Sequence, residues 1–447
     1  MNWINHKSIQ SVVSIMTLLL IASCNTKQSV TVSIANHSDR DYGTRLIEVP
    51  LHSIRQRLKL TNASASNNHI VVLNKQGEKI PIQITMDSLL LFPVSLEANQ
   101  QKQFTISSGE PTSEETIACG RVYPERLSDF AWENDKVAFR TYGPDLMAQG
   151  GISYGYDTFN KYGTSEPMLD EMYAGESNEK SLEKLRYLRT IDSKKAMEWA
   201  SIFSYHYDHG HGYDSYSVDQ TLGAGATALI VDGKLHFQNC WSKCTVLENG
   251  PLRMTAVLTF PKMVIKGDTV VEQRTITLDM GDHLNKTKVT YIGLKSISDV
   301  ASGIVLHEDG TPETIAAGYG CTHAPLHSAR EYGQYALDTK NRYMCYVDGT
   351  KGTDGSDIGD FYMGMISSEK CQEVARIPFS SDEVKLNHNR DFGHLLMNHK
   401  LTKDASLTYY WGTANQKDGE ILNLASWKQW IENYVYFLDN PIEVSIN

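Results

Sequence analysis

The sequence predicts a mainly β protein, in which a small N-terminal β-sandwich is followed by a large antiparallel β domain with few helices. Three observations predict this fold class. Short segments in which apolar and polar residues alternate, as they do in half-buried strands, recur along the chain. Turn-forming stretches, such as residues 74–77, separate these segments. Only two segments place apolar residues at helical spacing.

The composition fits two or three globular domains and excludes one class of partner. The chain has 447 residues, of which 41% are hydrophobic, enough for sizeable cores. Its 53 acidic and 42 basic residues give a formal net charge of -11, without any basic run. Phosphate contacts need clustered Lys and Arg, so we expect no nucleic-acid partner. The 23 Tyr, 12 Phe and 7 Trp suit the faces of sugars, although all-β cores use the same residues.

The N-terminus has the features of a lipoprotein signal peptide. Lys7 precedes an apolar run over residues 12–22, which is too short for a comfortable membrane span and the right size for a signal h-region. Residues 21–24, Ile-Ala-Ser-Cys, resemble the bacterial lipobox, in which the Cys becomes diacylated and forms the new N-terminus. We therefore expect residues 1–23 to be removed and Cys24 to carry a lipid anchor.

A polar tether over residues 24–29 follows the predicted cleavage site. It lacks the acidic run that resembles a surface-export signal in related bacteria. We therefore expect a lipid-anchored protein of the cell envelope, periplasmic rather than surface-exposed. No other segment is hydrophobic enough to cross a bilayer.

Residues 30–110 are predicted to form the small β-sandwich. Apolar and polar side chains alternate strictly over residues 30–34. Further short strands are expected over residues 69–73, 80–84, 89–93 and 103–107. Their regular spacing is typical of a sandwich of immunoglobulin-like size. Residues 109–115 form the most linker-like stretch of the chain.

The large domain, residues 116–447, is predicted to be mainly β as well. Its clearest strand spans residues 269–279, whose side chains alternate between two faces. One face carries Val271, Gln273, Thr275 and Thr277, and the other carries Glu272, Arg274, Ile276 and Leu278. Two helices are expected, over residues 181–189 and residues 424–438, and Asn440-Pro441 ends the second.

The cysteines are compatible with export. Cys240 and Cys244 lie four residues apart, close enough for a local disulfide or for two metal ligands. No second close pair supplies the other half of a zinc site, so metal binding by these cysteines is not expected. Free buried thiols are the alternative for several of the cysteines.

The densest group of polar residues lies within residues 205–216, which contain three His, two Asp and four Tyr. No packing pattern requires this composition. The candidate catalytic residues are His206, Asp208, His209, His211, Tyr213, Asp214 and Tyr216. In an extended segment, one face would carry His206, Asp208, Asp214 and Tyr216. Gly210 and Gly212 on that face would leave space for a ligand to approach the backbone.

The opposite face of the extended segment would carry His209 and His211, a workable pair of metal ligands. A divalent metal at this pair is the one possible cofactor, and no other is predicted. The alternative to a functional site is a glycine-bent loop in which the His and Asp side chains satisfy one another.

A second polar group lies within residues 121–144. Three Arg, a Trp and several Tyr lie there beside carboxylates. Arg can hold a carboxylate through two hydrogen bonds while Trp stacks on a ring, so this group suits a sugar that carries an acidic group. The candidate substrate-binding residues are Arg126, Trp132, Glu133, Arg140 and Tyr142, with His307 and His323 as polar groups that could converge on the same cleft. A salt-bridged strand edge is the alternative.

These two stretches resemble a family of bacterial lipoproteins catalogued as domain of unknown function 4861. The resemblance rests on residues 129–144 and on Asp208-His209-Gly210, with further matches at Gly212, Asp214, Tyr216, Val218 and Thr221-Leu222-Gly223. It covers nearly the whole mature chain. Members of the family are found in glycan-degradation gene clusters, and some are labelled unsaturated glucuronyl hydrolases. That label fits poorly, because such hydrolases resemble an all-helical (α/α) barrel whereas this chain is predicted to be β.

Residues 273–279 resemble the middle of galactose-mutarotase-like supersandwich domains. That resemblance implies that the large domain is an antiparallel β-supersandwich with a concave, sugar-binding sheet.

Together these features predict an exported lipoprotein that processes uronic-acid-containing oligosaccharides in glycan degradation. In β-elimination, Arg140 or a His would neutralise the uronate and a His or Tyr would remove the C5 proton. In hydrolysis, Asp208 with Asp214 or Glu133 would flank the bond. The abundance of His and Tyr favours elimination. The alternatives are a sugar mutarotase or epimerase, a non-catalytic glycan-binding lipoprotein and a structural partner of a degradation complex.

Overall fold

The computed structural model describes residues 28–58, 69–112, 114–295, 299–307, 331–349, 359–388, 390–401 and 405–447. The predicted signal peptide, the lipidation site Cys24 and the candidate residue His323 lie outside the described residues. Within these ranges, no helix combines the length and the apolar character needed to cross a membrane.

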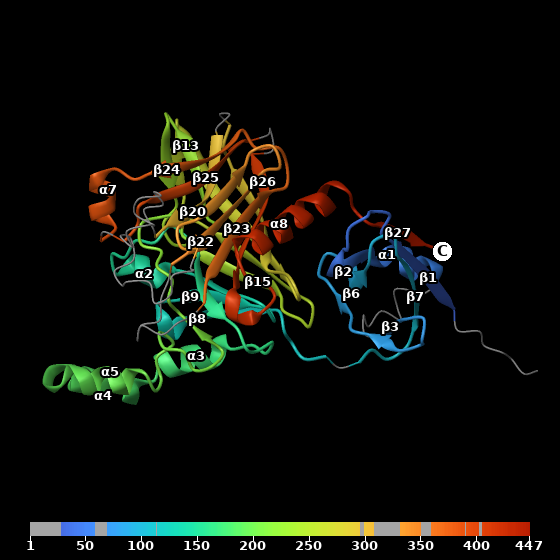
Figure 1. Ribbon diagram of the computed structural model, residues 1–447, viewed down its shortest axis with the longest axis horizontal. Coiled ribbons are helices and arrows are strands. Elements are labelled where there is room, and N and C mark those ends of the chain that lie inside the picture. The colour runs from blue at the N-terminus through green and yellow to red at the C-terminus, as the bar shows by residue number, and fades with distance from the viewer. Residues whose placement is uncertain are drawn as a thin grey trace, which may run out of the picture.

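The small domain is a sandwich of two antiparallel sheets, seen at the right of Figure 1. The strand orders are β27-β1-β7-β3-β4 and β2-β6-β5. The N-terminal strands are β1 (Ser29–Ala35), β2 (Gly43–Pro50), β3 (Ile70–Leu73), β4 (Lys79–Ile80), β5 (Gln83–Ile84), β6 (Leu89–Leu96) and β7 (Gln101–Ser108). The two sheets enclose one apolar core, which includes Val32, Phe92 and Phe104, and helix α1 (Leu51–Arg57) adds Ile54 to it.

The last strand of the chain, β27 (Glu443–Ile446), also lies in the small domain. It pairs antiparallel with β1, and Val32 is in register with Ile446. The sequence-based division, which assigns residues 116–447 to the large domain, does not include this return of the chain. The pairing covers the edge of β1 that would otherwise carry unpaired backbone groups.

Two large antiparallel sheets form the body of the second domain (Figure 1). One has the order β15-β16-β18-β19-β26-β23-β22-β21, with β17 beside β18, and the other has the order β14-β13-β20-β25-β24. The strands of the first are β15 (Lys243–Glu248), β16 (Arg253–Thr259), β17 (Met263–Ile265), β18 (Asp268–Asp279), β19 (Leu284–Ile292), β21 (Tyr335–Asp338), β22 (Tyr343–Asp348), β23 (Phe361–Ser367) and β26 (Ser406–Asn415). Those of the second are β13 (Thr227–Val231), β14 (Lys234–Phe237), β20 (Asp299–Leu306), β24 (Glu373–Pro378) and β25 (Gly393–Lys400).

The main core lies between these two sheets. It joins Ile276 and Leu278 of β18 to Ile304 of β20 and Leu395 of β25. Strand β18 buries the face that carries Glu272, Arg274, Ile276 and Leu278, in agreement with the alternation predicted from the sequence. The mainly β fold class is therefore confirmed.

A third antiparallel sheet has the order β12-β11-β10-β9-β8. Its strands are β8 (Cys119–Tyr123), β9 (Asp129–Glu133), β10 (Ala138–Thr141), β11 (Asp157–Lys161) and β12 (Gly212–Tyr213). The sheet packs on the main core through Trp132, whose indole donates a hydrogen bond to Asn285 Oδ1 at 2.7 Å, and through Tyr156, which stacks on Trp411 at 4.3 Å.

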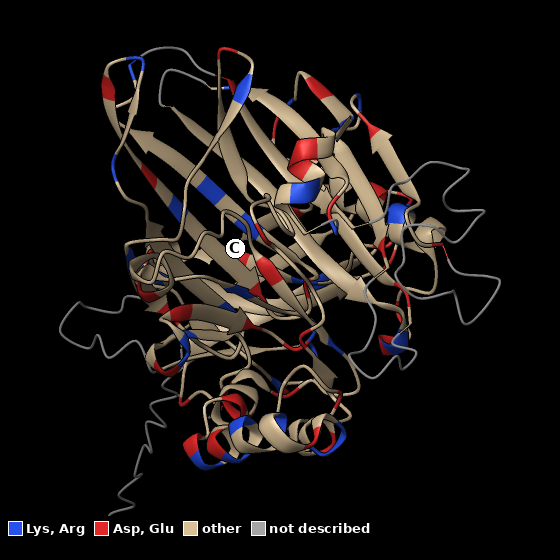
Figure 2. Cartoon of the chain, turned by 90° about the vertical axis from the view of Figure 1, so that its left-hand side faces the viewer, with Lys and Arg blue, Asp and Glu red and all other residues tan. Residues whose placement is uncertain are grey.

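The helices lie outside the sheets. They are α2 (Pro144–Ala148), α3 (Leu169–Glu176), α4 (Glu179–Ile191), α5 (Ser193–Ala200), α7 (Ser381–Leu386) and α8 (Leu424–Asp439), with 3-10 turns η2 (Pro124–Arg126) and η3 (Gln416–Asp418). The predicted helices 181–189 and 424–438 correspond to α4 and α8. Asn178 and Asn423 cap them, because each side chain accepts a backbone N–H of the first turn. Helices α4 and α5 extend from the large domain (Figure 1) and carry acidic and basic residues next to each other (Figure 2).

Candidate active site

The third sheet brings together the two polar groups that the sequence places far apart. Strand β11 pairs with β10 on one side and with β12 on the other. Arg140 of β10 is in register with Asp157 of β11, and Asn160 of β11 is in register with Tyr213 of β12. Residues 121–144 and 205–216 therefore contribute neighbouring strands of one sheet.

Arg140 is the centre of the resulting polar cluster, and it is buried. Its Nη2 lies 2.6 Å from Asp157 Oδ2 and 2.8 Å from Asp214 Oδ2. Its Nη1 donates to the Tyr205 hydroxyl at 2.9 Å. The hydroxyl of Tyr142 donates to Asp157. Burial lowers the pKa of Arg140, but Asp157 and Asp214 outweigh it, so the pKa lies well above its ordinary value.

His206 joins this cluster to the surface. Its side chain is 42% exposed, and its Nδ1 lies 3.2 Å from the Asp214 carbonyl oxygen, a hydrogen-bond partner, and 3.4 Å from Asp214 Oδ2, whose own side chain is 2% exposed. The ring lies edge-on against Tyr205, 4.7 Å between centroids. Burial raises the pKa of Asp214, while Arg140 and His206 act against that shift. Imidazole, carboxylate and guanidinium thus form a chain from the surface to the interior.

Arg126, at the end of η2, lies at the outer side of the same cluster. Its Nε donates to the Tyr205 hydroxyl at 2.9 Å, so Arg126 and Arg140 share this oxygen. It lines an open hollow of about 800 Å³, whose other residues are Glu125, Leu127, Glu176, Ser177, Glu179, Leu182, Glu183 and Arg186. Nearby, burial raises the pKa of Asp129 to about 6, even though Arg140 and Arg126 lower it.

A second buried polar group surrounds His307, at the end of β20. Its Nδ1 lies 2.8 Å from Asp348 Oδ2, and its Nε2 lies 2.9 Å from the Ser217 carbonyl and 3.5 Å from Asp391 Oδ1. Burial lowers the pKa of His307, but Asp348 and Asp391 raise it to about 9. The ring is therefore protonated at neutral pH, with both N–H groups directed at acceptors.

Tyr216 connects the two polar groups. Its ring lies edge-on against His307 at 4.8 Å. Burial raises the pKa of Tyr216 well above its ordinary value, and Asp348 and Asp157, one from each group, add to that shift. The Tyr216 hydroxyl has no hydrogen-bond partner among the described residues.

The segment 205–216 is not extended, so the predicted sharing of faces does not hold. Tyr205 to Gly210 form turns, and only Gly212 and Tyr213 are in a strand. Gly210 and Gly212 have φ of 95° and 118°, in the region that favours glycine, and they bend the chain. The loop agrees with the alternative of a glycine-bent segment in which His206 and Asp214 contact each other.

Two predicted catalytic residues of this bent loop, Asp208 and His209, make their hydrogen bonds outside the Arg140 cluster. Asp208 accepts hydrogen bonds from the Tyr162 hydroxyl at 2.6 Å and from the Gly210 N–H at 2.8 Å. The Nε2 of His209 lies 3.0 Å from the Ser204 carbonyl. Across the described ranges, no three His, Cys, Asp or Glu side chains gather as metal ligands would. A divalent metal at His209 and His211 stays a prediction.

Trp132 and Glu133 are buried in positions where they have no surface for a sugar. Trp132 belongs to the main core. Glu133 forms an ion pair with Lys161 at 2.7 Å and accepts the N–H of Met168 and of Leu169 at the start of α3. The reason is that β9 is covered on both faces, by the core and by α3. Side chains on either face of the strand are therefore buried. Tyr213 is fully buried as well.

The cysteines in the described part of the chain are free thiols, and Cys240 and Cys244 do not form a disulfide. Burial raises the pKa of Cys240 to about 11 and that of Cys244 to about 12, so neither is a thiolate at neutral pH.

Sequence reasoning missed three carboxylates of the site, Asp157, Asp348 and Asp391. Each is buried. Asp348 ends a strand whose other residues are all buried, and Asp157 begins such a strand. An acidic residue at the end of an apolar strand, as Asp348 is on β22, is a usable signal, because a buried carboxylate requires a partner.

Comparison with known proteins identifies the family. The family model described as "Domain of unknown function (DUF4861)" matches residues 34–444. The chain therefore belongs to this family, as its motifs indicate. It is 25% identical over 368 residues to "Uncharacterized protein P7" of Formosa agariphila, covering 80% of this chain and 78% of that protein.

Two solved structures show a distant likeness. One is an alpha-mannosidase from Enterococcus faecalis V583, with 8% identity and a TM-score of 0.44 over 94% of this chain and 46% of that one. The other is a protein in the glycosyl hydrolase family 38 from Enterococcus faecalis, with the same identity and TM-score over 94% and 47%. The chain spans less than half the length of these two proteins.

Proposed function

We propose that this member of the family is a carbohydrate-active enzyme that processes oligosaccharides by proton transfer at His206. One observation carries the proposal: a partly exposed imidazole is held by the buried Asp214, which is itself held by the buried Arg140. A partly exposed base that is oriented by a second group is the arrangement of general acid–base catalysis. The glycan as substrate class is supported by the family's occurrence in glycan-degradation gene clusters.

The substrate that fits this site best carries uronic acid. Arg140 cannot take the substrate carboxylate, because Asp157 and Asp214 already neutralise it in the interior. Arg126 is better placed. It lines the open hollow, is only partly buried and has no ion pair with any described residue. We therefore assign the carboxylate to Arg126 and a positioning role to Arg140.

The reaction proposed is β-elimination. His206 accepts the proton from C5 of the uronate, the C5–H electrons form a C4–C5 double bond, and the bond from C4 to the departing oxygen breaks. That oxygen takes up the proton that His206 accepted, or one from solvent. Arg126 stabilises the negative charge that develops on the carboxylate as the proton leaves.

Hydrolysis fits less well, because it needs two carboxylates that flank the bond. Glu133 is occupied by Lys161 and two backbone N–H groups, and Asp208 holds the turn of the loop. A mutarotase or epimerase would use the same proton transfer without bond cleavage. The lipid anchor at Cys24 and the periplasmic location stay predictions from the sequence.

A screen of uronic-acid oligosaccharides tests the proposal. Intact and lyase-generated substrates are incubated with the protein, and both released saccharide and ultraviolet absorbance of an unsaturated product are followed. The wild type should form the unsaturated product, and His206→Gln should lower the rate at least about 100-fold. His236→Gln, an exposed histidine on β14, is the matched control and should leave the rate unchanged.

Other outcomes identify the alternatives. Saturated products alone would indicate hydrolysis. A change of the sugar's configuration without cleavage would indicate an epimerase or a mutarotase. Binding of the oligosaccharides without turnover of any of them would contradict the proposal and support a glycan-binding lipoprotein.

A further inference from the structure

A cavity of about 510 Å³ lies between the small domain and the outer face of the nine-stranded sheet. Its residues are Glu48, Met86, Asp87, Leu89, Leu247, Glu248, Arg253, Thr255, Thr275, Thr277, Asp279, Asp282, Leu284, Lys286, Lys288, Tyr410 and Tyr434. None of them belongs to the sheet β8–β12 that holds the candidate active site. Domain interfaces are common places for small-molecule sites, and this volume is typical of them.

The register of the sheet lines up the polar groups of the cavity floor. Thr255 of β16 is opposite Thr277 of β18, which is opposite Lys286 of β19, which is opposite Tyr410 of β26. The next row pairs Thr275 with Lys288. Their neighbours along the strands face the main core, so these hydroxyl and ammonium groups project to the other side of the sheet.

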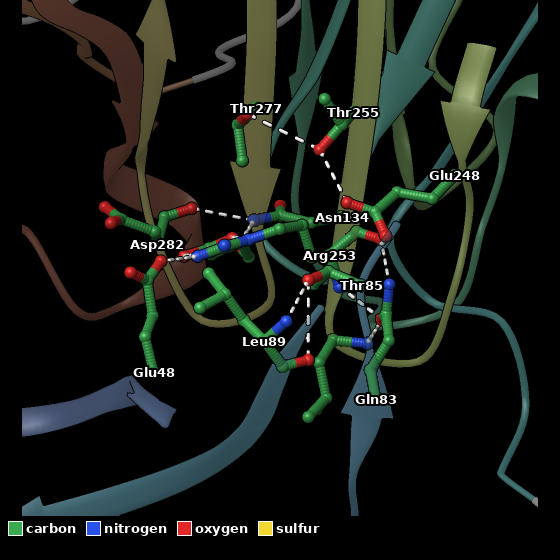
Figure 3. A network of polar contacts seen from close by, with 12 residues as sticks. Glu48, Gln83, Thr85, Leu89, Asn134, Glu248, Arg253, Thr255, Thr277 and Asp282 are labelled. Carbon is green, nitrogen blue, oxygen red and sulfur yellow. Dashed lines mark hydrogen bonds and ion pairs between the residues drawn. The ribbon is translucent and has the colours of Figure 1, made fainter. Parts of the chain in front are cut away.

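Two of the acidic residues at this junction, Glu48 and Glu248, contact Arg253 and Thr255, as Figure 3 shows. Arg253 lies 2.6 Å from Asp279 and 2.8 Å from Glu48 of the small domain, through Nε and Nη2 respectively. Glu248 accepts the Thr255 hydroxyl at 2.9 Å and the Met86 N–H at 3.3 Å.

Asp87 accepts the Thr85 hydroxyl, and the fifth carboxylate of the cavity is Asp282. It accepts the Leu284 N–H and the Tyr434 hydroxyl, each at 3.0 Å. These two donors are neutral, so they satisfy acceptors of Asp282 without adding a positive charge.

Two lysines contribute ammonium groups to the cavity floor. Lys286 and Lys288 are exposed, lie two residues apart on β19, and have no ion pair with any described residue. Met86 and Leu247 are exposed apolar residues of the same cavity. The cavity thus combines two available ammonium groups, a row of hydroxyl groups and apolar walls.

We propose that this interdomain cavity is a second saccharide-binding site, which takes an oligosaccharide with carboxylate or sulfate groups. Lys286 and Lys288 bind the anionic groups, the Thr255 and Thr277 hydroxyls bind sugar hydroxyls, and the apolar walls contact the ring faces. The inference rests on the proposed function only in taking the ligand to be a glycan. A second site on the same chain would hold a long polymer while its end reacts at His206.

Isothermal titration calorimetry on the full mature chain tests this inference. All variants carry His206→Gln, so that no turnover occurs during the measurement. The probes are a uronic-acid tetrasaccharide and its carboxyl-reduced, neutral counterpart. The double variant Lys286→Gln/Lys288→Gln should have an affinity for the acidic probe that is about tenfold lower or more at one class of sites, since charged hydrogen bonds are lost.

The matched control is Lys234→Gln/Lys243→Gln, which removes two exposed lysines outside the cavity. It should bind like the parent, and neither pair of substitutions should change the binding of the neutral probe. Equal affinity for the acidic probe in both double variants would overturn the inference. The proposed function fails separately, through absence of turnover by the wild type, so the two failures are distinguishable.

Discussion

The side-chain amide of Gln83, in the small domain, is hydrogen-bonded to the backbone of Arg253, in the large domain. Its Nε2 donates to the Arg253 carbonyl at 2.9 Å, and its Oε1 accepts the Arg253 N–H at 2.8 Å. The same oxygen accepts the Leu252 N–H at 2.9 Å. Gln83 is buried, and its side chain joins the two domains through these hydrogen bonds (Figure 3).

Replacing Gln83 with Ala should uncouple the two domains. The change leaves buried backbone groups of Leu252 and Arg253 without partners, which costs about 1–3 kcal/mol for each unsatisfied group. We expect urea unfolding to show two transitions, so that near- and far-ultraviolet circular dichroism give different midpoints. Gln101→Ala, an exposed position in the same domain, should keep a single transition. One cooperative transition of unchanged midpoint in Gln83→Ala would contradict this role.

Replacing Arg140 with Met should destabilise the fold strongly. The substitution leaves Asp157 and Asp214 buried without their cation, and breaking a buried ion pair in this way costs about 3–5 kcal/mol. The control is Arg121→Met. Arg121 is exposed and pairs with Asp170 at 2.7 Å, and surface ion pairs contribute about 0–1 kcal/mol. Chemical denaturation of both variants measures the difference. Equal losses of unfolding free energy in both would show that the Arg140 cluster is not a buried network.

Gly212→Ala should disrupt the pairing of β11 with β12, whereas Gly210→Ala should not. A Cβ at Gly212 would lie 1.9 Å from the Asn160 carbonyl oxygen, but a Cβ at Gly210 meets nothing within 4 Å. Both residues have positive φ, so each substitution carries a backbone strain of about 1–2 kcal/mol. The additional clash should make Gly212→Ala clearly less stable in thermal unfolding. Similar melting temperatures for the two variants would contradict the loop geometry.

The stability of the protein should fall as the pH rises from about 6.5 to about 9. Asp348 and Asp391 raise the pKa of the buried His307 from its ordinary 6.5 to about 9 in the folded state. The protonated ring therefore stabilises the fold. This contribution is complete below the pKa of His307 in the unfolded chain and is lost as the pH rises through its pKa in the folded protein. The full contribution is about 3 kcal/mol. Urea unfolding at several pH values should show that the free energy of unfolding of His307→Gln depends less on pH than that of the wild type. An unchanged dependence would exclude His307 as the source of the effect.

Local patterns predicted the elements of the fold but not their assembly. The alternation over residues 269–279 is a property of one strand, and the structure has that strand as β18 with the expected face buried. Helix α8 was equally predictable, because its apolar spacing and the Asn440-Pro441 sequence that ends it lie within one segment. The pairing of β27 with β1 joins the two ends of the chain, and no local pattern encodes such a contact.

The candidate site was predictable in composition and only partly in geometry. The sequence marked both stretches that meet around Arg140, because His, Asp and Arg are concentrated in them. It could not reveal that Asp157 binds Arg140, since that contact depends on the register of two strands. It assigned Trp132 to a sugar because aromatic side chains serve cores and binding sites alike, and only burial separates the two roles.

The role of His206 as the base can be tested by following the hydrogen at C5 of a uronic-acid oligosaccharide. With a substrate labelled with tritium at C5, the wild type should release label into water at the rate at which the unsaturated product appears. His206→Gln should release it at least about 100-fold more slowly, although the oligosaccharide still binds. Product formation with the label retained at C5, or release by His206→Gln at the wild-type rate, would contradict the assignment of His206 as the base.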